Sequence, residues 1–148
     1  MQKEITIAII TASWHNEITN ALTNDCINEL KQHCTNNNIK LNLLQYSVPG
    51  SVELPIIAKI VAEKKKVDAI IPIGVVIKGE TEHYTYVANQ VAYGCQKVAI
   101  ETNTPVIFGV LTCENIELAK ARTNGKHSKS GKEWAQVAID MTKLVNNI

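Results

Sequence analysis

A short polar segment, KGETEH at residues 78–83, holds side chains that could bind an anion and move a proton. Gly79 removes steric bulk where the backbone turns from an apolar run into helical spacing, and Thr81 can cap the helix. The free N–H groups at such a helix start bind phosphate and other anions. His83 falls in the first turn, where the helix dipole favours a neutral ring able to transfer protons near pH 7. The alternative is a surface histidine beside a capped helix.

Three further polar loops carry groups that could recognise a ligand. Trp14 follows the first β-branched run and is either a platform for a flat ring or a core residue, since aromatic rings dominate cores. Glu53 follows Pro49-Gly50 and is either an acceptor for a hydroxyl-rich ligand or a carboxylate favoured by the helix dipole. Lys126, His127, Lys129 and Lys132 collect in a basic loop, which is either an anion clamp or a solvated surface.

Strands alternate with helices along the whole chain. Apolar, β-branched runs predict strands at residues 5–11, 39–48, 69–77 and 106–111, and three- to four-residue spacing predicts the helices between and after them. This alternation predicts right-handed crossovers and a parallel sheet covered by helices on both faces. In such sheets ligands bind at the carboxyl ends of the strands. The loops after all four strands, at Trp14-His15, Ser51–Glu53, residues 78–83 and Thr112–Cys113, therefore predict one site.

Several local features lead to more detailed predictions. The apolar phase changes within residues 39–48, which a bulge or burial of both faces would explain. Pro72 argues against a central strand unless it sits where no ladder hydrogen bond is required. Ser51 is predicted to cap the second helix, and a short helix after the fourth strand is predicted to end near Arg122. The predicted apolar face of the second helix comprises Val52, Ile56, Ile57, Ile60 and Val61, and that of the last helix Trp134, Val137, Ala138, Met141, Leu144 and Val145.

Length and composition indicate the broad class. The 148 residues, 45% of them hydrophobic, suit one domain spanning residues 1–148. A formal charge of +1 disfavours a polyanion such as nucleic acid as the main partner. The four cysteines lack zinc spacing and the density of a disulfide scaffold, so we expect them reduced and buried, with no metal bound. The amino-terminal apolar run is too short for a signal peptide or a membrane span, which predicts a soluble, cytoplasmic protein.

Common nucleotide and hydrolase signatures are missing. No Gly-rich nucleotide loop follows the first strand, and no nucleophile elbow or Ser-His-Asp order occurs. The groups still available for function are an aromatic face, a carboxylate, a neutral histidine and an anion site. Together they fit a phosphorylated small molecule and a flat heterocycle brought together.

Three segments closely resemble the lumazine synthase family: VPGSVELP (48–55), IGVVIKGETEHYTYVANQVAYG (73–94) and TPVIFGVLTCENIELAKAR (104–122). The resemblance covers nearly the whole chain. It implies a flavodoxin-like three-layer α/β sandwich with a four-stranded parallel sheet in the order 2-1-3-4, and homopentamers or assemblies of pentamers. It also implies condensation of 5-amino-6-ribitylaminouracil with 3,4-dihydroxy-2-butanone 4-phosphate to 6,7-dimethyl-8-ribityllumazine, without a cofactor. The rival function is a non-catalytic flavin- or lumazine-binding module, because this fold hosts many functions.

The resemblance also assigns roles to individual residues. His83 matches the proton-transfer residue, and Arg122 matches a phosphate clamp presented by the adjacent subunit. The implied substrate-binding residues comprise the stacking ring Trp14, the ribityl segment Ser51, Val52 and Glu53, the heterocycle contacts Val76 and Ile77, the phosphate turn Gly79, Glu80 and Thr81, the adjacent subunit's Phe108, and the acidic position Glu133.

The sequence departs from the family pattern at a few of these positions. Trp14-His15 replaces the commoner Phe-Asn, and a larger ring can stack as well. Glu80 stands where small residues are usual, and its charge would repel a phosphate unless only its N–H faces the site. Ser130 occupies the place of a ligand-binding lysine in many relatives, so Lys129 is the candidate substitute.

Overall fold

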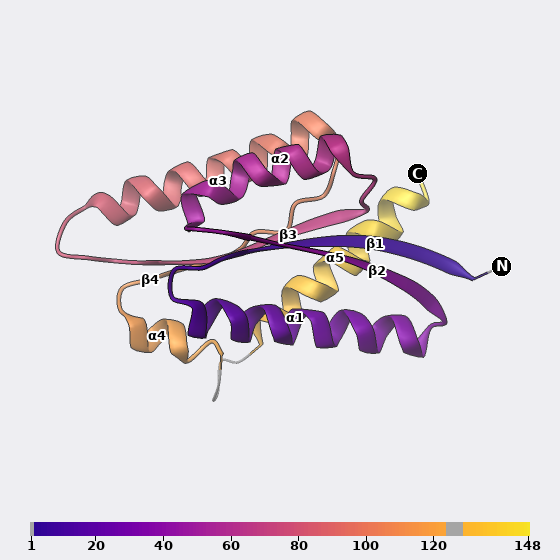
Figure 1. The fold of residues 1–148 in the computed structure, drawn as a ribbon, viewed down its shortest axis with the longest axis horizontal. Coiled ribbons are helices and arrows are strands. Elements are labelled where there is room, and N and C mark those ends of the chain that lie inside the picture. Colours follow the sequence, from indigo (N-terminus) through magenta and orange to yellow (C-terminus); the bar gives the residue numbers. More distant parts are fainter. Residues whose placement is uncertain (1, 124–128) are drawn as a thin grey trace.

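A four-stranded parallel sheet forms the middle of the structure, a computed structural model that describes residues 2–123 and 129–148 (Figure 1). Its strands are β1 (Lys3–Ala12), β2 (Ile39–Val48), β3 (Ala69–Ile77) and β4 (Gly109–Cys113). All three pairings are parallel and the order is β2-β1-β3-β4. The predicted α/β class and strand order 2-1-3-4 are therefore confirmed.

Helices cover both faces of this sheet and make three layers (Figure 1). On one face lie α1 (Asn16–Asn36), α4 (Ile116–Lys120) and α5 (Ser130–Asn146). On the other lie α2 (Leu54–Lys64), which follows the 3-10 turn η1 (Ser51–Glu53), and α3 (His83–Thr102). The described helices include none that is long and apolar enough to cross a membrane.

Each helical layer closes its own hydrophobic core against the sheet. Ile7, Ile9 and Ile71 pack with α1 and α5, whereas the alternate residues Ile10 and Ile70 pack with α2 and α3. This two-sided burial explains why β3 carries no polar residue along its length.

Burial of both faces also explains the change of apolar phase in β2. Its register with β1 runs without interruption from Lys3 opposite Ile39 to Ala12 opposite Val48, so the strand has no bulge against β1. Leu41 and Leu43 pack against one core, and Leu44 and Tyr46 against the other. Of the two explanations offered for the sequence pattern, the bulge is wrong.

Pro72 lies in central strand β3, at a place where the ladder to β4 is interrupted. The Ile70 N–H donates to the Pro105 carbonyl, and regular pairing resumes only at Ile73 opposite Gly109. Because N–H groups alternate sides along a strand, the missing N–H of Pro72 is on the same side as that of Ile70, towards β4. Pro72 therefore sits where no ladder hydrogen bond is required, as the sequence predicts. The predicted strand at 106–111 is correspondingly displaced: β4 begins at Gly109 and continues to Cys113.

Two predicted helix faces need correction. In α2 the buried residues are Leu54, Ala58 and Val61, whereas Val52 in η1 and Ile56 and Ile60 in α2 are exposed. In α5 the buried residues are Gly131, Ala135, Ala138, Ile139 and Thr142, whereas Val137, Leu144 and Val145 are exposed. The buried sides combine small residues with a few larger ones, Leu54 and Val61 in α2 and Ile139 in α5, and the other large aliphatic residues lie on the flanks.

The predicted burial of the cysteines is confirmed for three residues. Cys26, Cys34 and Cys95 are buried, Cys113 is half-buried, and all four are unpaired. Burial raises the pKa of the Cys26 thiol to about 12, with a further contribution from Asp25, and the pKa of the Cys95 thiol to about 11.

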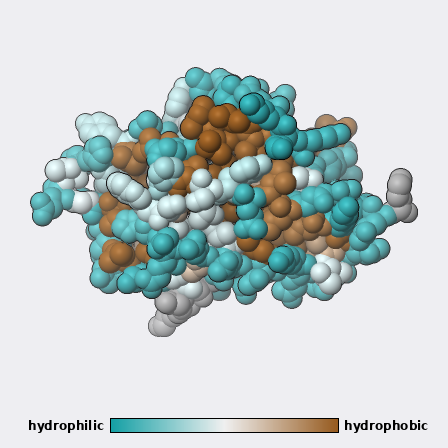
Figure 2. All heavy atoms as spheres, viewed as in Figure 1, coloured by the Kyte–Doolittle hydropathy of each residue, from teal (hydrophilic) through white to brown (hydrophobic). Residues whose placement is uncertain are grey.

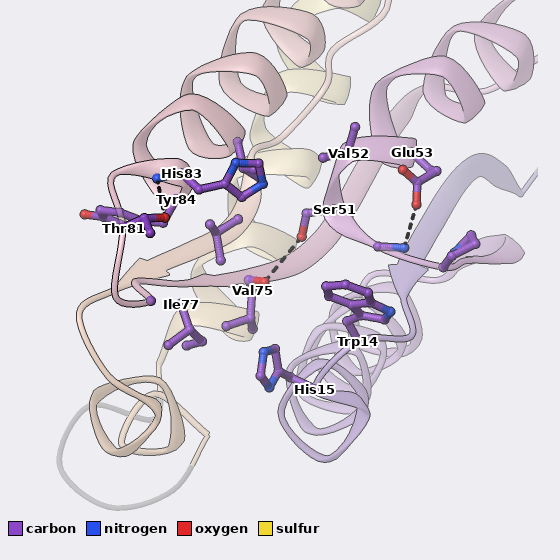
Figure 3. A pocket seen from close by; sticks show the side chains of 15 residues that line it. Trp14, His15, Ser51, Val52, Glu53, Val75, Ile77, Thr81, His83 and Tyr84 are labelled. Carbon is purple, nitrogen blue, oxygen red and sulfur yellow. Dashed lines mark hydrogen bonds between the residues drawn. The ribbon is translucent and has the colours of Figure 1, made fainter.

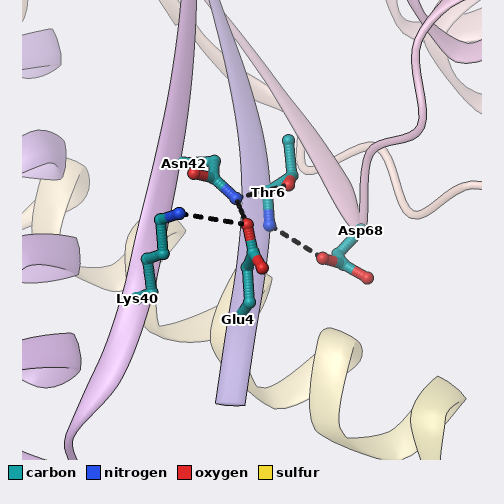
Figure 4. A network of polar contacts seen from close by, with 5 residues as sticks. All are labelled: Glu4, Thr6, Lys40, Asn42 and Asp68. Carbon is teal, nitrogen blue, oxygen red and sulfur yellow. Dashed lines mark hydrogen bonds and ion pairs between the residues drawn. The ribbon is translucent and has the colours of Figure 1, made fainter. Parts of the chain in front are cut away.

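A closed polar network occupies the amino end of the sheet (Figure 4). The Asp68 carboxylate accepts a hydrogen bond from the Thr6 N–H at 2.8 Å, and the Asp68 N–H donates to the Thr6 carbonyl at 2.8 Å. Glu4 accepts a hydrogen bond from Asn42 and lies 3.9 Å from the Lys40 ammonium. These polar groups therefore satisfy one another.

Candidate active site

A cavity of about 420 Å³ opens at the carboxyl edge of the sheet, where the sequence predicts a site (Figure 3). It lies between the loop after β1, the turn η1, the end of β3 and the start of α3. The predicted site residues that line it are Trp14, Ser51, Val52, Glu53, Val76, Ile77, Gly79, Thr81 and His83.

Trp14 stands on one side of the cavity with 72% of its surface exposed, so the ring is not a core residue. Hydrogen bonds to the end of β2 fix its backbone: Ser13 N–H donates to the Val48 carbonyl at 2.8 Å, and Trp14 N–H to the Pro49 carbonyl at 3.1 Å. An exposed indole held in this way offers a flat apolar face to a heterocycle.

The start of α3 forms the opposite side of the cavity (Figure 3). Thr81 Oγ1 accepts a hydrogen bond from the His83 N–H at 3.2 Å, but the N-cap residue of α3 is Glu82, whose side chain makes no capping hydrogen bond, so the predicted cap position is wrong by one residue. The prediction that His83 belongs to the first helical turn is confirmed, because α3 begins at this residue. The Thr81 hydroxyl hydrogen remains able to donate to a bound anion.

The turn η1 supplies the third side, and here the predicted cap is wrong. Ser51 does not cap a helix; its hydroxyl donates to the Val75 carbonyl at 3.5 Å. Gly74 leaves the space that Ser51 fills, since a Cβ there would collide with the serine side chain. Glu53 Oε1 accepts a hydrogen bond from the Gly50 N–H at 3.0 Å, which orients the carboxylate and leaves its second oxygen able to accept.

Five predicted site residues do not line this cavity: Glu80, Phe108, Arg122, Lys129 and Glu133. All five are exposed, and Phe108 precedes β4. Arg122 follows α4 near Cys113, where its guanidinium opposes the rise that burial causes in the pKa of the Cys113 thiol. Within the basic loop, Lys126 and His127 lie outside the described residues.

The cavity also contains residues that the sequence reading did not assign. They are His15, Pro49, Gly50, Val75, Tyr84 and Val87. Val75 and Tyr84 adjoin residues that were assigned, so their place in the motif could have identified them. His15 belongs to a loop that the sequence predicts at the site, but it received no role of its own, since a polar residue after a strand is common.

The arrangement sets an aromatic face and a carboxylate across from a histidine and a helix start. Valine, isoleucine and proline side chains line much of the cavity, so a bound ring is desolvated while polar groups orient its edges. Such a cavity can hold a flat ring at Trp14 and an anion near Thr81 at the same time.

Fold and cavity together define an α/β protein that binds a small molecule at the carboxyl edge of a parallel sheet. A family model described as 6,7-dimethyl-8-ribityllumazine synthase matches residues 4–146. A protein of that name from Coxiella burnetii (strain Dugway 5J108-111) is 41% identical over 143 residues, which cover 96% of this chain and 92% of the relative. Two namesakes, from strains CbuG_Q212 and RSA 493 / Nine Mile phase I, are 40% identical over the same shares. The chain belongs to the 6,7-dimethyl-8-ribityllumazine synthase family.

Proposed function

We propose that this chain condenses 5-amino-6-ribitylaminouracil with 3,4-dihydroxy-2-butanone 4-phosphate, giving 6,7-dimethyl-8-ribityllumazine, phosphate and water in riboflavin biosynthesis. The observation that carries the proposal is the cavity in which Trp14 stands opposite Thr81 and His83 (Figure 3). The reaction needs one site for a ring and one for a phosphate, close enough for the two substrates to react.

The ring substrate would bind on the Trp14 side. Its pyrimidine stacks on the indole, next to Val76 and Ile77, and its ribityl hydroxyls reach Ser51, Val52 and Glu53. The free oxygen of Glu53 suits this role because a carboxylate accepts from hydroxyl groups.

The phosphorylated substrate would bind at the start of α3. Gly79, Glu80 and Thr81 form the turn whose N–H and hydroxyl groups receive the phosphate. Glu80 is exposed and does not line the cavity, which accords with a carboxylate that stays in solvent and does not oppose the anion.

Positioning supplies much of the rate in this scheme. An amine held against a ketone condenses through a Schiff base, with loss of water. His83 then moves protons during phosphate elimination and ring closure, and cationic groups stabilise the leaving phosphate.

The site is completed by a neighbouring subunit. Phe108, Arg122, Lys129 and Glu133 lie outside the cavity of their own chain and are exposed, which supports their presentation to an adjacent copy. Arg122 would clamp the phosphate, Phe108 would cover the ring, and Lys129 and Glu133 would contribute charge at the rim.

Exposed apolar side chains support assembly into a homopentamer or a set of pentamers. Tyr86, Tyr93 and Ile100 recur every seven residues along α3, and Ile56 and Ile60 are exposed on α2. Hydrophobic side chains gather over α2 in Figure 2. Apolar surfaces of this kind mark interaction sites. The four cysteines are unpaired, which supports a location in the reducing cytoplasm.

The activity is tested by mixing the protein with both substrates and recording the absorbance of the lumazine product. Repeated turnover is expected. A protein that binds the pyrimidine or the product with no turnover would be a binding module and would contradict the proposal.

Assembly is tested by sedimentation of the wild type and of Ile56→Ser. The wild type should sediment as five subunits or a multiple of five, and the serine variant should shift to smaller particles while it remains folded. Lys59→Ser, in the same helix, is the control and should leave the particle size unchanged. A monomeric wild type at micromolar concentration would exclude the assembly.

A further inference from the structure

The short helix α4 differs from the other helices in how its start is held. Asn115 precedes α4 with an extended backbone, and its side-chain oxygen accepts a hydrogen bond from the Leu118 N–H at 2.9 Å. Of the helices α1 to α5 in the described chain, α4 alone has a capping hydrogen bond from the side chain of its N-cap residue. The capped helix is also the shortest of the five.

Its length explains why α4 needs this hydrogen bond. A helix of five residues has little stability of its own, because the first turn fixes several residues for few hydrogen bonds. The 21-residue helix α1 buries Leu22 and Leu30 completely. In α4 only Ala119 is buried, with Ile116 packed beside it. Because this apolar contact is small, polar contacts at the two ends decide whether α4 stays wound.

The carboxyl end of α4 is held by hydrogen bonds on both sides of Arg122. The Arg122 N–H donates to the Ala119 carbonyl at 3.0 Å, and the Thr123 N–H donates to the Lys120 carbonyl at 3.0 Å. Thr123 Oγ1 also donates to the Lys120 carbonyl, at 2.7 Å. The backbone of Arg122 is therefore fixed by the last turn of α4, although the residue is exposed.

The segment before the cap is attached to the strand that leads into the anion-binding turn. The Lys78 N–H, just after β3, donates to the carbonyl of Cys113, the last residue of β4, at 2.9 Å. Figure 1 shows α4 at the same end of the sheet as the start of α1. The position of Arg122 relative to the sheet thus depends on Asn115, which joins the fixed end of β4 to α4.

We propose that Asn115 is a positioning residue for Arg122. Its capping bond keeps α4 wound, and a wound α4 holds the guanidinium where it binds the phosphorylated substrate in the site of the neighbouring subunit. An arginine on a loose segment must first be ordered, which weakens binding, whereas one on a fixed helix has less freedom to lose. The inference rests on the proposed function, because it takes Arg122 to be the phosphate clamp.

Three substitutions separate capping from direct contact with the substrate. Asn115→Ala removes the cap. Asn115→Ser replaces the amide by a hydroxyl that caps about as well, whereas Asn115→Gln keeps an amide but is not a preferred capping residue. Asn115 is exposed and α4 buries little apolar surface, so all three variants should assemble and melt as the wild type does.

Affinity for the phosphorylated substrate is measured by titration of each variant. Asn115→Ala and Asn115→Gln should bind about three- to tenfold more weakly than the wild type, the range for the loss of a helix cap, and Asn115→Ser should stay within about twofold. Affinity for the ribitylaminopyrimidine should not change. Wild-type affinity in Asn115→Ala would overturn the inference. Full affinity in the glutamine variant with a loss in the serine variant would also overturn it, because the amide would then contact the substrate itself.

A double-mutant cycle tests whether Asn115 acts through Arg122. In the Arg122→Ala protein, adding Asn115→Ala should cause no further loss of affinity, because the group that the cap positions has been removed. An equal loss with and without Arg122 would overturn the inference. A wild type that forms lumazine while the Asn115 variants bind normally refutes this inference alone, whereas a wild type that neither binds the phosphorylated substrate nor forms lumazine refutes the proposed function with it.

Discussion

The two ends of the sheet carry polar residues in opposite states. At the amino end, Glu4, Lys40, Asn42 and Asp68 pair with one another or with the Thr6 backbone (Figure 4). At the carboxyl end, polar side chains surround a cavity and keep donors and acceptors that no described residue fully uses (Figure 3). Polar groups that bond to one another stabilise a fold, whereas polar groups with unused donors or acceptors in a cavity can bond to a ligand.

The backbone differs between the ends in the same way. The Asp68 carboxylate and N–H extend the ladder between β1 and β3 in regular geometry. Strain appears instead at His15, beside the cavity. The difference indicates that polar groups at the amino end of the sheet serve stability, whereas those at the carboxyl end are available to a ligand. We therefore expect substitutions at one end to change activity and those at the other to change the free energy of unfolding.

The largest effect is expected at His83. His83→Ala should lower kcat about 100-fold, the lower end for general acid–base catalysis, because positioning supplies the rest. Steady-state lumazine formation measures it. His33→Ala, in the last turn of α1, is the histidine control and should keep wild-type kcat. Complete loss of turnover in a folded, assembled His83→Ala protein would contradict this prediction.

Arg122 should come next. Arg122→Ala should weaken binding of the phosphorylated substrate by about 1.5–3 kcal/mol, the scale of hydrogen bonds to charged groups. Titration of the phosphorylated substrate measures this loss. Lys120→Ala removes a neighbouring positive charge in α4 and should have little effect. Equal losses in the two variants would indicate a general effect of charge.

The proposal that two subunits share the site allows a sharper test with the same variant. His83→Ala and Arg122→Ala subunits, unfolded and refolded together, should form mixed rings in which about a quarter of the interfaces pair an intact His83 with an intact Arg122. Activity should then rise above the average of the two parents. If mass spectrometry proves mixed rings and the activity stays at that average, both residues act within one subunit.

Trp14→Ala should weaken pyrimidine binding by about 1–2 kcal/mol, through lost stacking and lost apolar contact area. Calorimetry measures the change. Trp14→Phe keeps a flat ring and should retain most of the affinity. Because the indole is exposed, the melting temperature should hardly change. A large fall in melting temperature with unchanged affinity would assign Trp14 to stability and break the distinction between the two ends.

At the amino end an effect on stability is expected, and none on activity. Asp68→Ala should lower the free energy of unfolding by about 1–2 kcal/mol, because the half-buried Thr6 N–H loses its acceptor. Urea unfolding measures the loss, and Asp68→Asn, which keeps an acceptor oxygen, should lose less. Pyrimidine affinity should remain at the wild-type value. Altered affinity here would show that the two ends are coupled.

Much of the fold and part of the site could be predicted from local patterns. Unbroken apolar runs, helical spacing and the Gly79–Thr81 turn involve residues only a few positions apart. They predicted the strands, a parallel sheet between two layers of helices, and the position of His83 at a helix start. The edge at which the polar loops meet followed from parallel pairing. That edge is where the cavity lies, but Thr112 and Cys113, which were predicted in a loop at the site, belong to β4 and do not line the cavity.

The buried face of α2 and α5 depended on tertiary structure. Apolar residues occupy more than one side of each helix, so spacing alone did not choose among them. Packing chose the sides with small residues, such as Ala58 in α2 and Ala135 in α5, and left Ile56 and Val137 exposed. The start of β4 likewise depends on its neighbour β3. Pro72 has no N–H to donate to β4, and regular pairing begins only at Ile73 opposite Gly109.

By itself, then, the sequence determined the alternation of strands and helices, their parallel arrangement and the edge that carries the site, because each depends on residues close together in the chain. Only the tertiary structure decided that Ser51 bonds to β3 instead of capping a helix, and that His15 adopts a positive φ. Both outcomes depend on segments distant in sequence. Val75 lies 24 residues from Ser51, and hydrogen bonds to Val48 and Pro49 hold the loop in which His15 adopts its positive φ.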